Sequence, residues 1–179
     1  PDHLRFASLC LLALEAGGGD PYLDLASDYV GNWADAILAS DVMPVGLLSS
    51  GPVTDLSGDA ESAYRSFAGM AGHLDDDVDR VENLLASHAV DVMLNLWHET
   101  GHSRFRAAAE RLLDVLATQL HDPDAGAAAD VIRTYRRITG DPRYDDAIRE
   151  VVKPLDPLSV RTLGLQPDVD RPDRPHGIG

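Results

Sequence analysis

One turn between helices recurs three times in this chain, and it constrains the fold more than any other feature of the sequence. Residues 12–22, 96–105 and 135–144 each read as an apolar helix end, a glycine, a short polar link, an aromatic residue and a new helix. Glycine ends a helix readily because it adopts the left-handed conformation at little cost. Similar segments repeated along a chain are typical of stacked structural units. The sequence therefore predicts an all-α protein built from helical hairpins.

The spacing of the turns limits the architectures that the helical hairpins can form. Gly19, Gly101 and Gly140 mark the three turns, and Gly58 lies near the middle of the longer interval. The resulting period of about 40 residues suits both open α-solenoids and closed α/α toroids.

Two irregular segments, at 41–56 and 70–77, interrupt the helical pattern. Long loops of this kind can build a cleft at one end of a toroid, because loops carry binding residues on a rigid scaffold. We predict that residues 1–153 form hairpins of an (α/α) toroid and make up an incomplete portion of the ring. We predict that residues 154–179 form an irregular Pro/Asp-rich tail or a linker to the remainder of the polypeptide.

Helix boundaries follow from apolar spacing near 3.6 residues and from glycine, proline and Asp signals. Segment 41–56, with its Gly and Pro residues, is expected to be a loop that contains a short strand. The helices are expected at about 4–16, 20–39, 60–70, 78–100, 103–120, 125–139 and 142–152.

The charge of the chain limits its partners. The net charge is −15, and a strongly acidic surface repels nucleic acid and anionic membranes. No apolar run approaches the length of a membrane-spanning helix. We therefore expect a soluble chain, cytoplasmic or secreted, that binds neither nucleic acid nor membrane.

The make-up of that charge is also informative. There are 24 Asp against 6 Glu, and 14 Arg against 1 Lys. Short carboxylates hold water and cations in strong brine, so the composition predicts a halophilic host. A GC-rich genome is the alternative explanation, because it also favours Asp, Arg and Ala codons.

His98-Glu99-Thr100-Gly101-His102 matches the zinc-peptidase motif H-E-x-x-H. That chemistry requires one unbroken helix through both histidines. The repeated turn predicts instead that Gly101 ends a helix and that His102 lies at the start of the next one. We expect no metal and no cofactor, and a zinc metallopeptidase through His98, Glu99 and His102 stays as an alternative.

A polar stripe on the expected 78–100 helix is the stronger candidate site. His88, Asp91, Asn95 and His98 lie on one side of the helical wheel, next to an apolar face. A solvated surface would also explain such a stripe. In an enclosed apolar setting, however, a carboxylate has a raised pKa and can act as a general acid at neutral pH.

The stretch Val90–Leu96 with Trp97 and Glu99–Gly101 resembles the unsaturated-uronyl hydrolases, and the resemblance covers about residues 89–152. These enzymes are six-hairpin α/α toroids that act on the unsaturated sugar left by polysaccharide lyases. The resemblance implies that Asp91, which precedes a Met-x-Asn stretch, is the general acid/base that hydrates the vinyl ether of the uronate. The family's second Asp, in a His-Asp-x-Gly-Phe setting, has no match here. Sugar epimerases and several lyases share the turn pattern.

Further candidates lie between the two irregular segments. Tyr64 and Arg65 could bind a uronate, because aromatic rings stack on sugars and Arg pairs with carboxylates. An ordinary amphipathic helix explains them equally well. His73 opens an acidic cluster that ends near Asp79, which is typical of a helix start; a cleft wall or a calcium site would also use such a cluster.

Together these features predict a carbohydrate-active enzyme, a glycoside hydrolase or a polysaccharide lyase, acting on an acidic glycan or its oligosaccharides by general acid/base chemistry. Asp91 and His88 are the predicted catalytic residues. The predicted substrate-binding residues are Tyr64, Arg65, His73 and Asn95. A non-catalytic helical-repeat scaffold that binds partners is the remaining alternative.

Overall fold

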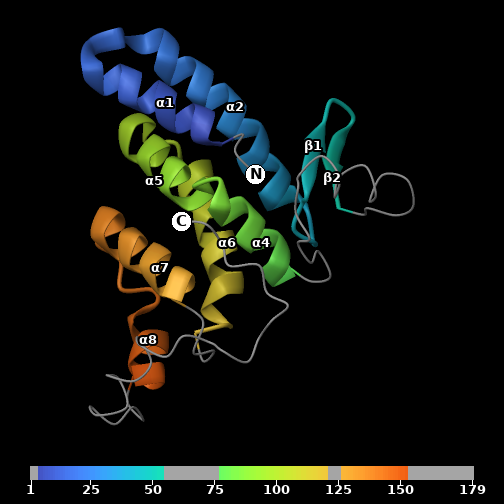
Figure 1. Ribbon diagram of the computed structural model, residues 1–179, viewed down its shortest axis with the longest axis vertical. Helices are drawn as coiled ribbons and strands as arrows, with labels where there is room; N and C mark the ends of the chain where they lie inside the picture. The colour runs from blue at the N-terminus through green and yellow to red at the C-terminus, as the bar shows by residue number, and fades with distance from the viewer. Residues whose placement is uncertain (1–3, 55–76, 121–125, 153–179) are drawn as a thin grey trace, which may run out of the picture.

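The computed structural model describes residues 4–54, 77–120 and 126–152, and this part of the chain is mainly helical (Figure 1). A π-helical turn, Leu14–Gly18, continues the first helix. One two-stranded sheet is formed by β1 (Gly46–Leu48) and β2 (Gly51–Val53). The helices are α1 (Arg5–Ala13), α2 (Asp20–Ala39), α4 (Asp77–Ala86), α5 (Ala89–Thr100), α6 (Ser103–Ala117), α7 (Gly126–Thr139) and α8 (Asp145–Val152). The described residues are therefore mostly helical, with this one small sheet, which is compatible with the predicted all-α class.

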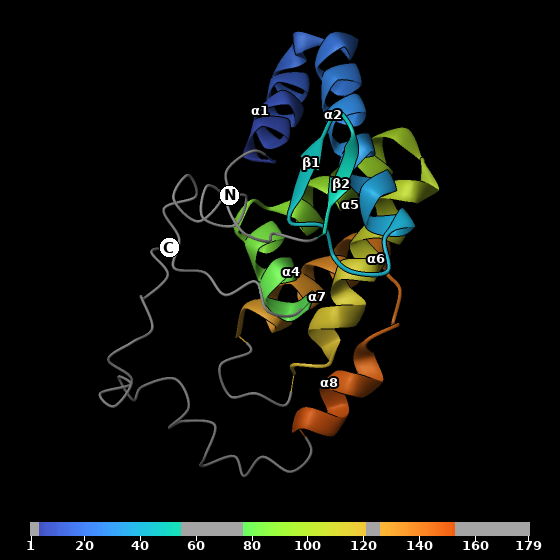
Figure 2. The same ribbon diagram turned by 90° about the vertical axis from the view of Figure 1, so that its right-hand side faces the viewer.

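The helices pack as neighbouring hairpins around α6. The hairpin of α1 and α2 lies along α5 and α6, with α2 packed against both of them (Figures 1 and 2). On the other side α7 packs against α5 and α6, while α4 covers another part of α6. No helix within the described ranges is long and apolar enough to cross a membrane.

Two of the predicted turns are built in the same way. Gly101 and Gly140 have φ angles of 72° and 70°, and the N–H of each donates to the carbonyl four residues earlier. The hydroxyl of Thr100 donates to the Leu96 carbonyl at 2.6 Å and accepts from the N–H of His102 at 3.2 Å. Thr139 repeats both bonds, at 2.8 and 3.1 Å. The repeat read from the sequence is therefore a repeat of structure.

The first turn uses glycines differently. Gly17 and Gly19 have φ angles of 90° and 81°, which only glycine adopts without strain. Gly19 rather than Asp20 precedes the first helical residue of α2, and no side chain caps this end. The predicted turn is confirmed, and Asp20 is the first residue of α2. Pro21 still lies in the first turn of the helix, where it needs no hydrogen-bond partner.

The predicted helix over 78–100 is wrong, because the chain breaks at Ser87 and His88. His88 has φ 65° and ψ 28°, a left-handed conformation that separates α4 from α5. The break could not be read from the sequence. The apolar residues keep a helical spacing on both sides of it, and the left-handed residue is a histidine rather than a glycine or proline.

Helix α8 also begins later than predicted, at Asp145 rather than Pro142. A turn comes first, in which the Asp141 carboxylate accepts from the N–H of Arg143 at 3.0 Å and the Pro142 carbonyl from that of Asp145 at 2.9 Å. The short strand expected in 41–56 is confirmed by the antiparallel pair, in which Gly46 faces Val53 and Leu48 faces Gly51.

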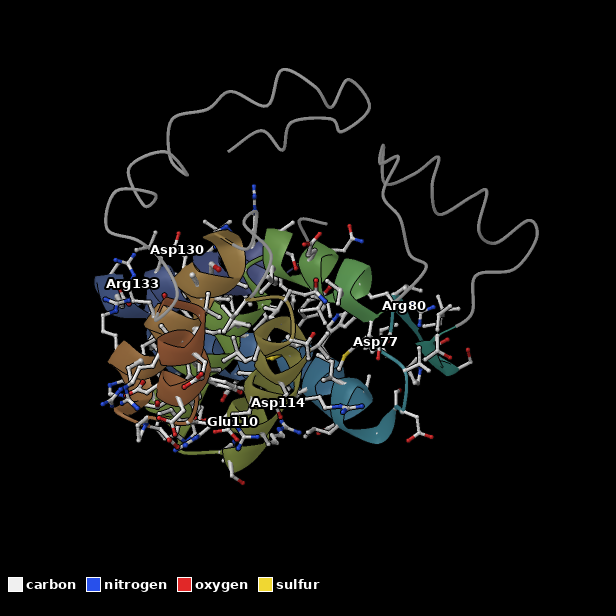
Figure 3. The ribbon with its side chains drawn as sticks, turned by 90° about the horizontal axis from the view of Figure 1, so that it is seen from below. Asp77, Arg80, Glu110, Asp114, Asp130 and Arg133 are labelled. Carbon is white, nitrogen blue, oxygen red and sulfur yellow. The ribbon has the colours of Figure 1, made fainter. Side chains whose placement is uncertain are left out.

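Two charged residues of α4 hold the segment that precedes the hairpin. The N–H of Met43 donates to the Asp77 carboxylate at 2.9 Å, and Arg80 donates to the Met43 carbonyl at 3.3 Å. Figure 3 shows Asp77 and Arg80 next to each other beside the hairpin. Asp77, the last residue of the acidic run that begins after His73, therefore binds backbone.

The core runs through all the packed helices. Trp33 is buried, and Trp97 is half-buried at the edge of the core. The largest completely buried side chains are Tyr135, Phe105, Leu4, Ile37, Met43, Met93, Leu94, Leu96, Leu112, Leu113, Leu116 and Ile132. The helix predicted at 60–70 and the tail predicted at 154–179 lie outside the described residues.

Candidate functional site

The break between α4 and α5 is built by backbone bonds around Ser87 and His88. The N–H groups of Ser87 and His88 donate to the carbonyls three residues earlier, at 3.1 and 2.8 Å, which closes α4. The buried Ser87 hydroxyl donates to the Leu84 carbonyl at 2.7 Å. The His88 carbonyl then accepts from the N–H of Val92 at 3.0 Å, so α5 starts at once.

His88 is the only non-glycine residue with positive φ among those described. The left-handed conformation costs a residue with a Cβ about 1–2 kcal/mol. Such strained residues concentrate at functional sites, where the surrounding structure holds them in place. The strained residue, His88, is therefore also one of the four residues of the predicted polar stripe.

The break brings the two predicted catalytic side chains together. Nδ1 of His88 lies 3.7 Å from Oδ2 of Asp91, in the first turn of α5. The two side chains are 51% and 40% exposed. The enclosed apolar setting predicted for the carboxylate is therefore not found, and the pair faces solvent.

The rest of the stripe is also exposed. Asn95 and His98 lie on the outer side of α5, whereas Met93, Leu94 and Leu96 are buried. Among the described residues the stripe thus forms one solvated edge of the helix. It can reach a ligand only from outside.

The zinc motif lacks the helix it needs. Gly101 ends α5, and His102 is an extended residue just before α6, so His98 and His102 do not share a helical face. The His102 ring instead stacks near Phe105, with centroids 6.3 Å apart. In the part of the chain that the structure describes, no three His, Cys, Asp or Glu side chains are placed to hold a metal ion.

The densest set of polar contacts lies elsewhere, between α6 and α7. Arg106 donates from Nε to Glu110 at 2.7 Å, from Nη2 to the Tyr135 hydroxyl at 3.0 Å, and to the Asp141 carboxylate. The Tyr135 hydroxyl donates to Glu110 at 2.6 Å. The guanidinium also lies over the ring of Trp97, 5.3 Å from its centroid.

A second set joins the turn before α8 to α6. Arg143 donates from Nη2 to both oxygens of Asp114, at 2.9 and 3.1 Å, and the Tyr144 hydroxyl donates to Asp114 at 2.9 Å. Glu110 connects the two sets, since its Oε2 lies 3.8 Å from Arg143. Figure 3 shows Glu110 and Asp114 together on α6. We call the two sets the α6 network, which comprises Arg106, Glu110, Asp114, Tyr135, Asp141, Arg143 and Tyr144.

The environment shifts several pKa values in the α6 network. Burial, with help from the bond to Glu110, raises the pKa of Tyr135 to about 12. Burial also raises the pKa of Tyr144. Burial pushes the pKa of Asp141 upward, but bonds from the Arg143 N–H, Tyr135 and Arg106 outweigh it, and the pKa is lowered. The raised pKa values keep Tyr135 and Tyr144 neutral to higher pH, and the lowered pKa keeps Asp141 charged to lower pH.

This network is structural in its geometry. Each carboxylate has an Arg or Tyr partner within the cluster, which leaves little capacity for proton transfer to a substrate. Sequence reasoning missed it. The Arg106–Glu110 spacing of four residues and the Asp, Arg and Tyr of the turn at 140–144 were the available signals.

A groove of about 570 Å³ lies between the second half of α2 and the β-hairpin. Its polar groups are few, and one of them, Asp35, is already paired with Arg104 at 3.1 Å. The lining residues are Asn32, Asp35, Ala36, Ala39, Leu47, Leu48, Ser49, Gly51 and Pro52. None of the predicted site residues lines it.

Three predicted substrate-binding residues, Tyr64, Arg65 and His73, lie outside the described residues. The structure therefore brings together only His88 and Asp91 from the predicted set, with Asn95 one turn further along α5. Comparisons with protein-family models, with curated proteins and with solved structures found no match for this chain.

Proposed function

We propose that the chain is part of an α/α-toroid enzyme that acts on an acidic glycan, with Asp91 as the general acid/base. The observation that carries the proposal is the strained backbone of His88, which fixes an imidazole 3.7 Å from that carboxylate. The stacked hairpins and the repeated Thr-Gly turns support the toroid architecture, because hairpins in such rings pack side by side.

His88 acts as a positioning residue in this proposal. The carboxyl group of Asp91 gives a proton to the sugar, and His88 orients that group from the preceding turn. Because Asp91 faces solvent on the described side, the rest of the cleft comes from other parts of the polypeptide. Tyr64, Arg65 and His73, which lie outside the described residues, remain the residues proposed to bind the substrate.

The net negative charge of the chain makes the proposed activity dependent on salt. An acidic protein repels a uronate, so salt that screens the repulsion should favour turnover. A halophilic setting is therefore part of the proposal.

The test is turnover of unsaturated uronate oligosaccharides by the chain and by Asp91→Asn. Loss of the sugar's double bond is followed by its ultraviolet absorbance. We expect Asp91→Asn to reduce turnover by at least about 100-fold, the usual contribution of a general acid. Asp130→Asn is the matched control, because that exposed carboxylate lies on α7 and its partner among the described residues is the exposed Arg133, at 3.4 Å.

Equal turnover by Asp91→Asn and the unchanged chain would disprove the assignment of Asp91. His88→Gln is expected to lower kcat with little effect on KM. A comparable change in both parameters would argue that the histidine contacts substrate.

A non-catalytic binding scaffold is the second candidate, and the exposure of Asn95 and His98 favours it. A scaffold binds glycan without consuming it, and its affinity does not depend on protonation of Asp91. Calorimetric titration with the same oligosaccharides, in parallel with the turnover assay, separates the two functions.

A further inference from the structure

Two turns of the internal repeat carry an arginine at the same place. Arg104 and Arg143 each occupy the third position after the turn glycine and directly precede an aromatic residue. Each guanidinium lies over the ring that follows it, 5.1 Å from the centroid of Phe105 and 5.7 Å from that of Tyr144. Attraction between cation and ring helps to hold each arginine in place.

Both arginines reach a neighbouring hairpin that lies earlier in the chain. The hairpins α1–α2 and α7–α8 lie on opposite sides of α5 and α6 (Figure 1). Arg104, in the first turn of α6, donates from Nη1 to the Asp35 carboxylate of α2 at 3.1 Å. Arg143, in the turn before α8, donates from Nη2 to both oxygens of Asp114 on α6, at 2.9 and 3.1 Å. We call these two contacts the inter-hairpin ion pairs.

The two inter-hairpin ion pairs also match in the residue that lies next to the guanidinium. One helical turn before the paired aspartate lies Gly31 on α2 and Glu110 on α6. A Cβ on Gly31 would lie 2.5 Å from Nη2 of Arg104, so the guanidinium occupies the space of that side chain. Oε2 of Glu110 lies 3.8 Å from Nη1 of Arg143. Each arginine therefore lies against the same two positions of its partner helix.

We propose that the inter-hairpin ion pairs fix the angle at which each hairpin stacks on its neighbour. Apolar packing holds the helices together but is non-directional, whereas hydrogen bonds from a planar guanidinium to a carboxylate require a defined geometry. The four paired side chains are 39% to 59% exposed, so the pairs contribute only modestly to the free energy of unfolding. Their main effect is on arrangement, because an angle repeated from hairpin to hairpin sets the curvature of the stack.

The test measures distances between hairpins with pairs of spin labels, in a chain whose buried Cys10 is replaced by alanine. One pair of labels joins α2 to α5, at Leu25 and Glu99. The other joins α8 to α5, at Asp146 and Glu99. The three labelled sites are exposed. We expect one narrow distance distribution for each pair when both inter-hairpin ion pairs are intact.

Gly31→Ala should broaden the α2–α5 distribution and leave the α8–α5 distribution unchanged, because the added methyl displaces Arg104. Asp114→Ala should do the reverse, since it removes the carboxylate that binds Arg143 and Tyr144. Each variant is thus the control for the other. Distances that neither substitution changes overturn the proposal. Substitutions that each disturb both distances also overturn it, since they would show a general loosening of the fold.

A second measurement is the folding equilibrium constant of Gly31→Ala. In a helix interior this substitution normally raises the constant by up to about fivefold, because alanine has the higher helix propensity. The gain should be smaller in the unchanged chain, where the methyl conflicts with Arg104, than in the Arg104→Ala background. The same change in both backgrounds overturns the proposal, because the guanidinium could then leave Asp35 at no cost.

Discussion

The break at His88 and the α6 network differ in how their charged side chains are paired and exposed. In the α6 network, buried tyrosines and two arginines tie three carboxylates to one another across α6, α7 and the turn before α8. At the break, one imidazole and one carboxylate lie 3.7 Å apart, half exposed, on a strained backbone. The first arrangement stabilises the fold, whereas the second leaves its polar groups free to meet a ligand.

This comparison shows that a dense set of charges is a poor guide to function here. Groups that satisfy one another have little left to offer a substrate, and structural ion-pair networks shift pKa values as active sites do. The pair of His88 and Asp91 is the better candidate, because it lies at a strained position and both side chains are about half exposed.

The largest effect is expected from breaking the α6 network at Arg106. Arg106→Met keeps the apolar stem over Trp97 but removes the arginine bonded to Asp141 and leaves Glu110 with the longer 3.8 Å contact to Arg143. Because these carboxylates are partly exposed, we expect a loss of about 2 kcal/mol of unfolding free energy, below the value for a fully buried pair.

Urea denaturation measures this loss, and Arg133→Met is its control. Arg133 pairs with Asp130, and the two side chains are 81% and 76% exposed, so its loss should stay below about 0.5 kcal/mol. Equal losses for the two variants would show that the network contributes no more than a surface ion pair.

The pH dependence of stability tests the tyrosines of the α6 network. The pKa of Tyr135 rises from its ordinary 10.0 to about 12, so the unfolded state loses the phenol proton first. Stability should therefore hold below about pH 10 and fall as the pH rises towards 12. Denaturation across this range checks it, and Tyr135→Phe should fall less steeply. Tyr144, whose pKa is also raised, should preserve part of the slope.

A smaller, opposite effect is expected at the break. His88→Gly removes the strain of a left-handed residue and should raise the unfolding free energy by about 1 kcal/mol. His88→Ala keeps the strained φ and should not stabilise the protein. Thermal and urea unfolding of both variants decide the point, and a stabilised alanine variant would contradict the strain argument.

The smallest effect is expected for Asp91→Asn, which should change stability by less than about 0.5 kcal/mol, because its pair with His88 is half exposed. This near-neutral result matters for the turnover assay, since it separates lost chemistry from lost folding. A large destabilisation would make Asp91 part of the scaffold.

The sequence predicted most of the fold but less of the site. The turns at Gly101 and Gly140 were predictable because glycine at a helix end has a backbone reason. The break at His88 was not, since nothing in the local sequence distinguishes a left-handed histidine from a helical one. The surroundings of Asp91 could not be fixed from the sequence for a different reason. Whether the polar stripe is enclosed or solvated depends on how helices pack around α5, and the described residues have the solvated arrangement that the stripe also allowed.

The α6 network could be predicted only in part. The Arg106–Glu110 spacing predicts a contact within one helix. Tyr135 and Asp141 join it through the packing of α7 on α6, and a pattern read along a single helix carries no information about that packing.

The Thr-Gly turns have a consequence for how this chain can change over evolution. In both turns a threonine of the outgoing helix binds the N–H of the residue after the glycine, so that residue's own side chain need not do so. The position is occupied by His102 in one turn and by Asp141, locked into the α6 network, in the other. A residue at this position can therefore change without loss of the turn. A pair of histidines with metal-ligand spacing, such as His98 and His102, can arise there by chance.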